Sequence, residues 1–172
     1  TKNTLIQGVT PFIFSRNANA GINQYPESDI LLCNDDIEGL TDDDLSILEE
    51  IANKEPKLGL LSAKINGPAC NQLQNNCTST VEHTETNIAF ICVYIKRALI
   101  KEIGLLDERF VHYGFEDTDY CHRTMVAGWK VGVTSRVEVT HLGSESFKKR
   151  YGPNLNGALA HGHMLFAQKY SQ

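Results

Sequence analysis

The chain carries adjacent acidic residues directly after a short apolar run. Ile30–Cys33 is apolar and lacks helical periodicity, which predicts a buried strand, and Asn34, Asp35 and Asp36 follow it. Ligands of open α/β sheets bind beyond the carboxyl ends of the strands. Two carboxylates about 4 Å apart repel by roughly 4 kcal/mol at an effective dielectric constant of about 20, unless water, a proton or a cation compensates. Mg²⁺ and Mn²⁺ take such oxygen ligands together with substrate phosphates, whereas a solvated turn explains the same residues without a ligand.

A second acidic cluster lies further along the chain, among aromatic residues. Asp107 precedes it, and Glu116, Asp117 and Asp119 stand close together at the start of an expected helix. Carboxylates beside apolar rings have raised pKa values, which suits a general base. The alternative is that the last three acids only complement the positive end of the helix dipole.

Histidine provides a third candidate group. His141 ends an expected strand, where it completes a metal site with the acidic strand end or is simply hydrogen-bonded. His161 and His163 are expected on the surface of the last helix.

Strand and helix patterns alternate along the chain, which indicates an α/β layered sheet. Thr41 is the expected N-cap of the clearest helix, and Gly104 and Gly128 are expected to end two others. Residues 10–22 are expected to end in a polar loop, and residues 66–86 to form a long surface loop. The expected strands are 29–33, 57–65, 87–97 and 129–141, and the expected helices are 39–56, 98–104, 116–128 and 156–170.

Composition narrows the class of protein. The 172 residues predict one domain, and a net charge of −5 disfavours a nucleic-acid-binding protein. No apolar run is long enough to span a bilayer, and no signal peptide is recognised. Five cysteines without CxxC spacing predict reduced thiols in a cytoplasmic protein, with peripheral membrane attachment left open. Pairing of Cys70 with Cys77 also stays open.

Several of these segments together resemble the family 2 glycosyltransferases with the GT-A fold, especially the rhamnosyltransferase-like branch. The likeness covers Phe12–Phe147, and its most specific part is Ile103–Lys130, with the pattern G-x-x-D-E-R-F … E-D-x-D-x-x-x-R … A-G-W-K. The resemblance implies a Rossmann-like domain with a mixed, mostly parallel sheet flanked by helices. Nothing before Phe12 matches the family's usual first nucleotide-binding strands, so residues 1–172 are expected to form a partial domain of this type.

The resemblance implies roles for the residues of the donor site. Asn19 and Gly21 match the N-x-G of the loop that shapes the nucleotide pocket. Asn34 and Asp36 match the N-x-D form of the DxD motif, which binds Mn²⁺ or Mg²⁺ and the sugar-nucleotide diphosphate, and Asp35 occupies its variable middle position.

The resemblance also implies roles in catalysis and acceptor binding. Asp117 matches the catalytic base of inverting members, and Glu116 and Asp119 would support the acceptor site. Asp107 matches the acid that approaches the donor sugar. His141 matches a histidine near the metal and diphosphate. Ser144 matches a residue of the flexible segment that closes over the donor, and residues 144–172 comprise this segment and the last helix.

The function implied is metal-dependent, inverting transfer of a hexosyl group from a nucleotide-diphosphate sugar, with UDP or dTDP expected, to an acceptor hydroxyl, as in polysaccharide biosynthesis. One rival is a non-catalytic relict that binds a glycan or a nucleotide. Another is a nucleotidyltransferase, which also uses strand-end acids and Mg²⁺, but no glycine-rich basic phosphate loop stands near the start of the chain.

Overall fold

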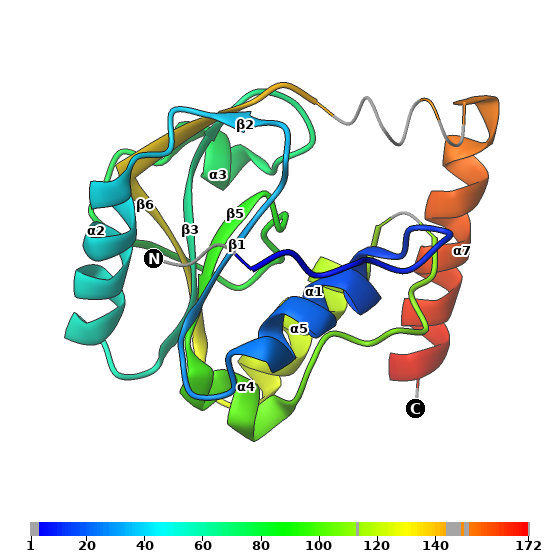
Figure 1. Ribbon diagram of the computed structural model, residues 1–172, viewed down its shortest axis with the longest axis horizontal. Coiled ribbons are helices and arrows are strands. Elements are labelled where there is room, and N and C mark those ends of the chain that lie inside the picture. Colours follow the sequence, from blue (N-terminus) through cyan, green and yellow to red (C-terminus); the bar gives the residue numbers. More distant parts are fainter. Residues whose placement is uncertain (1–3, 113, 144–148, 150–151, 172) are drawn as a thin grey trace.

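A mixed sheet forms the centre of the molecule (Figure 1). The computed structural model describes residues 4–112, 114–143, 149 and 152–171. The strands are β1 (Ile30–Cys33), β2 (Ile37–Glu38), β3 (Leu58–Asn66), β4 (Glu82–Thr84), β5 (Cys92–Ile95) and β6 (Lys130–His141). They follow the order β1-β5-β3-β6-β2, and β4 pairs with the first half of β6.

The directions of the strands correct one expectation. The α/β class and the mixed sheet are confirmed, but the expected mostly parallel pairing is wrong, because β3 and β6 are the only parallel neighbours among the described strands. The neighbours β1–β5, β3–β5, β2–β6 and β4–β6 are antiparallel. All of β5 is buried, as the apolar run 87–97 predicted. The apolar composition of a strand indicates that both of its faces are covered, but it does not indicate the direction in which the strand runs.

Strand direction brings two chain segments to one edge of the sheet. Because β1 and β3 are both antiparallel to β5, and β6 is parallel to β3, the strands β1, β3 and β6 run the same way. The carboxyl ends of β1 and β6 therefore lie at the same edge. The short strand β2, directly after Asp36, pairs there with the end of β6.

Helices cover both faces of the sheet. The helices are α1 (Phe14–Gln24), α2 (Asp42–Lys54), α3 (Gln72–Asn76), α4 (Arg97–Ile103), α5 (Glu116–Val126) and α7 (Leu155–Tyr170), with a 3₁₀ turn at Gly152–Asn154. Helices α1, α4 and α5 pack on one face through Ile22, Leu99 and Tyr120. Helix α2 covers the other face through Leu48 and Ile51. Helix α7 lies beyond α5, on the side away from the sheet (Figure 1).

Helix α1 replaces the polar loop expected near its position. Asn19 and Gly21 therefore lie on a helix, which corrects the expected loop. The buried residues Ser15, Asn19 and Ile22 follow helical spacing, so tertiary packing outweighs the low helix propensity of an asparagine-rich sequence. The described residues before Phe12 form no strand.

The expected surface loop and the expected terminal helix can also be compared with the structure. The region 66–86 is not only a loop, because it contains α3 and β4, and the side chain of Asn71 caps α3 by accepting from the backbone N–H of Gln74 at 2.8 Å. Helix α7 confirms the expected terminal helix, whereas residues 144–148 lie outside the described residues.

The five cysteines are free thiols, so Cys70 and Cys77 do not pair. Within the described ranges, no helix has the length and apolar character needed to cross a membrane.

Candidate functional site

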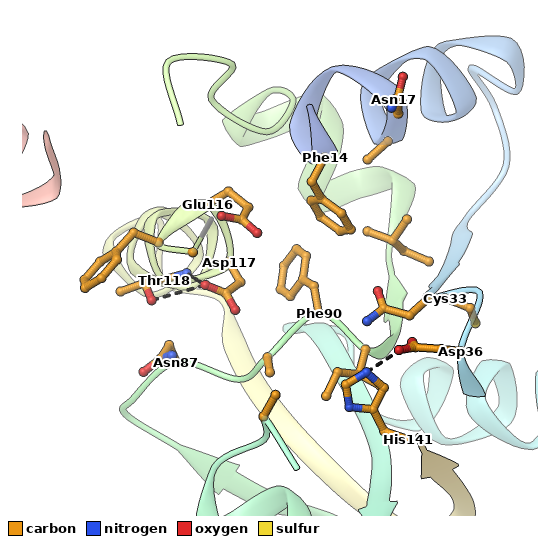
Figure 2. A pocket seen from close by; sticks show the side chains of 18 of the residues that line it. Phe14, Asn17, Cys33, Asp36, Asn87, Phe90, Glu116, Asp117, Thr118 and His141 are labelled. Carbon is orange, nitrogen blue, oxygen red and sulfur yellow. Dashed lines mark hydrogen bonds and ion pairs between the residues drawn. The ribbon is translucent and has the colours of Figure 1, made fainter. Parts of the chain in front are cut away.

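A cavity of about 970 Å³ opens at the edge of the sheet where β1 and β6 end (Figure 2). Its walls come from the turn after β1, the end of β6, the start of α5, the first turns of α1 and the segment before β5. Six of the residues predicted for the site line it: Asn34, Asp35, Asp36, Glu116, Asp117 and His141. The structure therefore brings the acids that follow β1, the first two acids of α5 and the histidine to one cavity.

Backbone pairing holds Asp36 beside His141. Strand β2 begins at Ile37, which lies opposite His141 in the register, and the N–H of Leu142 donates to the carbonyl of Asp36 at 3.0 Å. The distance from His141 Nε2 to Asp36 Oδ1 is 3.1 Å, and the histidine side chain is only 2% exposed. The sheet itself thus fixes this pair.

The second ring nitrogen of His141 determines what Nε2 can do. His141 Nδ1 lies 2.8 Å from the carbonyl of Pro68, and since a carbonyl only accepts, we assign the proton to Nδ1. In the neutral ring, Nε2 then presents a lone pair to the carboxylate of Asp36. Either protonation of Nε2 or a shared cation satisfies this arrangement. A backbone carbonyl that orients a histidine in this way is typical of metal ligands.

Asp36 Oδ1 and His141 Nε2 could serve as two ligands of a divalent cation. Among the described residues, no three His, Cys, Asp or Glu side chains converge on one point. Mg²⁺ and Mn²⁺ in nucleotide-using proteins commonly complete their coordination with substrate phosphates and water. Asn34 and Asp35 line the same wall of the cavity.

Glu116 and Asp117 lie at the start of α5, across the cavity. Gly114 and Phe115 have φ values of 86° and 74°, and this left-handed turn leads the chain into the helix. Asp117 Oδ1 accepts from the backbone N–H of Thr118 at 2.6 Å and from its hydroxyl at 3.3 Å. Glu116 Oε2 is buried and has no hydrogen-bond partner in the described part of the chain.

Burial changes the protonation of this carboxyl pair. Burial and the neighbouring charge of Asp117 raise the pKa of Glu116 to about 8. Burial also raises the pKa of Asp117, although the hydrogen bonds from Thr118 oppose this. The pair therefore holds a proton at neutral pH. A carboxyl group with a raised pKa is suited to proton transfer near neutral pH.

Aromatic side chains separate the two polar groups of the cavity. The rings of Phe14 and Phe90 lie between the Glu116–Asp117 pair and the Asp36–His141 pair in the view of Figure 2. Phe12 and Phe115 also line the cavity. Flat apolar surfaces between a few polar groups are typical of sites for small molecules that contain rings.

Asn19 and Gly21 lie on α1, outside the lining of the cavity. Asn19 Nδ2 donates to the carbonyl of Leu106 at 2.9 Å and to Glu108 at 3.0 Å, and its Oδ1 accepts from the N–H of Leu106 at 3.0 Å. Asn19 therefore connects α1 to the segment between α4 and α5. The structure gives it this positioning role, and its contact with a nucleotide stays a prediction.

Asp107 and Asp119 also lie outside the lining, within a network of charges. Asp107 bonds Arg109 and Lys169, and these cations hold the pKa of its carboxyl well below the usual range. Asp119 is fully buried and bonds Arg123, Lys169 and Tyr170. Their predicted contacts with substrate stay predictions. Ser144 lies outside the described residues.

Several residues of the cavity were not predicted. Phe14, Asn17 and Ala18 line it from one side of α1, at the i, i+3 and i+4 spacing of a helix, which the expected loop concealed. Phe90 and Thr118 could have been found, because the first precedes the most apolar strand and the second follows the predicted base. Asn87 carries no sequence signal of a site.

Comparison with known proteins adds a distant relative. No protein-family model matches the chain. A protein of Sinorhizobium fredii (strain NBRC 101917 / NGR234), named "Uncharacterized protein y4gI", is 24% identical over 167 residues. The match covers 83% of this chain and 18% of that protein, so the chain spans about a fifth of its relative's length. The relative's name gives no activity.

Proposed function

We propose that this chain is a metal-dependent glycosyltransferase domain of the GT-A type, which moves a sugar from a nucleotide-diphosphate donor to an acceptor hydroxyl with inversion. One observation carries the proposal: the Asp36–His141 pair and the Glu116–Asp117 pair face a single cavity. The motifs that resemble family 2 glycosyltransferases supply the residues of both pairs. A volume of about 970 Å³ is sufficient for a sugar nucleotide and part of an acceptor.

Asp36 and His141 are the residues that would hold Mn²⁺ or Mg²⁺. Such an ion, when bound, neutralises the charge that develops on the diphosphate leaving group. Backbone pairing at β2 keeps both side chains in place, so little reorganisation accompanies binding. Asn34 and Asp35, which line the same wall, would contact the diphosphate and sugar hydroxyls of a UDP or dTDP sugar.

Asp117 is the proposed base. It would take the proton of the acceptor hydroxyl as that oxygen attacks the sugar carbon from the face opposite the diphosphate. A raised pKa favours proton acceptance at neutral pH, and the bonds from Thr118 orient the carboxylate. A single displacement of this kind inverts the anomeric centre. The aromatic rings between the two pairs would contact the apolar face of the sugar.

Calorimetric titration with UDP, dTDP and GDP, each with and without Mn²⁺, tests the donor site. We expect one nucleotide to bind, with affinity that depends on Mn²⁺. Asp36→Asn should abolish the metal dependence. Asp43→Asn is the matched control, because Asp43 is exposed on α2 and lies outside the lining of the cavity, so this variant should retain that dependence. Equal metal dependence in wild type and Asp36→Asn contradicts the proposed metal site.

Release of the nucleotide diphosphate from UDP- and dTDP-sugars then tests catalysis. Asp117→Asn should bind donor as wild type does and release nucleotide about 10²–10⁴-fold more slowly. Equal turnover in the variant excludes Asp117 as base. Donor binding by the wild type without turnover, with a panel of saccharide acceptors present, would instead support the non-catalytic binding module.

A further inference from the structure

Cys33 and Cys92 form a pair of opposed thiols that the proposed reaction does not use. They are direct partners in the antiparallel register of β1 and β5, and their sulfur atoms lie 3.7 Å apart. Opposed residues of adjacent strands point to the same face of a sheet. Both thiols belong to the cluster that packs under α2.

The position of this pair in the ladder suits a disulfide. The next pair along, Asn34 and Ile91, is hydrogen-bonded, because the N–H of Asn34 donates to the carbonyl of Ile91 at 2.9 Å. Hydrogen-bonded and non-hydrogen-bonded pairs alternate in an antiparallel ladder, so Cys33 and Cys92 occupy a non-hydrogen-bonded pair, with Cα atoms roughly 4.5 Å apart. Disulfides need Cα separations of about 4.4–6.8 Å, so the strands need not move apart or together.

Exposure distinguishes the roles of the two thiols. Cys33 is partly exposed and is among the residues that line the cavity, whereas Cys92 is fully buried. A small oxidant therefore meets Cys33 first, and Cys92 is the nearest thiol behind it. The other cysteines have different neighbours. Cys70 contacts the carbonyl of Gly67, Cys77 that of Val133 and Cys121 that of Ile88.

We propose that Cys33 and Cys92 are a site of reversible oxidation, at which hydrogen peroxide or another small peroxide produces an intrachain disulfide. The Cys33 thiol reduces one peroxide molecule, giving a sulfenic acid and one water, or one alcohol if the peroxide is organic. The Cys92 thiol then attacks that sulfur, which forms the S–S bond and releases water. Two thiols are oxidised and one peroxide is reduced, and a dithiol reductant restores both thiols. The bond joins β1 to β5 directly before Asn34.

Peptide mapping of the folded protein tests the site. The chain is treated with hydrogen peroxide, its remaining thiols are alkylated before unfolding, and it is digested with trypsin without reduction. Cys33 is the single cysteine of the tryptic peptide 17–54, and Cys92 lies in the peptide 65–96 with Cys70 and Cys77. We expect these peptides to be linked, with fragmentation spectra placing the bond at Cys92. Free thiols should fall from five to three and return with dithiothreitol.

Two variants and a control make the result specific. Cys33→Ala and Cys92→Ala should each abolish the link completely, whereas Cys70→Ala should form it as wild type does. Circular dichroism confirms that each variant is folded, and the partly exposed Cys33 provides the safer variant if loss of the buried thiol prevents folding. The proposal is overturned if all five thiols survive, if Cys33 proceeds to sulfinic acid without a link, or if the link joins two chains or uses Cys70 or Cys77.

Discussion

At the scale of single residues, the carboxyl pair Glu116–Asp117 differs from ordinary acids because the pKa of each carboxyl group is raised. Its burial favours the protonated form, and the unpartnered Oε2 of Glu116 receives no compensating hydrogen bond from the described residues. A buried acid without such compensation makes folding sensitive to pH. This sensitivity can be measured without knowledge of any substrate.

Glu116→Gln should make the protein more stable at alkaline pH. The pKa of Glu116 is about 8 in the folded chain, against 4.5 for an ordinary glutamate, so the folded state binds more protons between these values. The free energy of unfolding of the wild type therefore falls as pH rises from about 4.5 through 8. The variant should lack this part of the fall and exceed wild type by on the order of 2 kcal/mol at alkaline pH, with little difference near pH 4.

Urea unfolding at a series of pH values measures this difference. Glu49→Gln is the matched control, because Glu49 is an exposed glutamate on α2 and should leave the slope unchanged. The free energy of unfolding of Glu116→Gln should still depend on pH in part, since the pKa of Asp117 is also raised. If the free energy of unfolding depends on pH identically in wild type and Glu116→Gln, then Glu116 is charged in the folded chain.

Residue type and local position were sufficient to predict part of the site. Asp36, Asp117 and His141 each stand at a strand end or a helix start, where the sequence and the family resemblance led us to expect them, and all three line the cavity. Asn19 and Asp119 could not be assigned in this way. Asn19 bonds Leu106, 87 positions away, and Asp119 bonds Lys169, 50 positions away, and no local pattern contains such partners.

At the scale of elements, α7 packs against the turn that leads into α5. A Cβ atom at Gly162 would lie 2.8 Å from the carbonyl oxygen of Gly114 and 3.1 Å from the ring of Phe115. The rings of Phe115 and Phe166 are 6.0 Å apart. Because this turn positions Glu116 and Asp117, the packing of α7 against the turn affects the position of the carboxyl pair.

Two glycines of α7 should respond in opposite ways to alanine. Gly162→Ala meets a backbone atom that cannot move aside, so we expect a loss of about 1–3 kcal/mol. Gly157→Ala meets nothing within 4 Å and should gain about 0.5–1 kcal/mol from helix propensity. Thermal unfolding of both variants measures the contrast. Equal effects of the two substitutions would contradict the close contact between α7 and the turn.

The sequence was a good guide to elements whose signals are local. Helix α2 has its Thr41 cap and acidic first turn, and Gly104 ends α4 with a φ of 81°, both as predicted. The expected mostly parallel sheet and the loop expected in place of α1 were wrong for a different reason. Strand pairing joins segments that are far apart in the chain, such as β1 and β5, and α1 is stabilised by buried contacts that its own composition does not reveal.

At the scale of the whole molecule, an ion network secures the end of α7 to the rest of the fold. Lys169 Nζ lies 2.7 Å from Asp107 Oδ2 and 2.6 Å from Asp119 Oδ1, and its side chain is largely buried. Tyr170 donates to Asp119 at 2.8 Å. Two acids from different segments thus share one lysine of the last helix.

Lys169→Met should loosen α7 while leaving the sheet intact. Loss of a largely buried cation leaves its acids with fewer partners, so we expect amide hydrogen exchange in α7 to increase by about ten-fold or more. Exchange in β3 should not change. Lys101→Met is the control, because Lys101 pairs with Glu27 on the exposed surface, where ion pairs contribute little. Faster exchange throughout the chain would contradict this local role, and so would unchanged exchange in α7.

The main-chain frame around Asp36 and His141 has a consequence for engineering. Since backbone bonds between β2 and β6 set the distance between the two positions, the side chains there can be exchanged without rebuilding their support. Softer ligands such as cysteine or a second histidine favour zinc over magnesium and manganese. At the proposed metal site, one substitution at position 36 would therefore change which metal is preferred, with the cavity and its carboxyl pair left as they are.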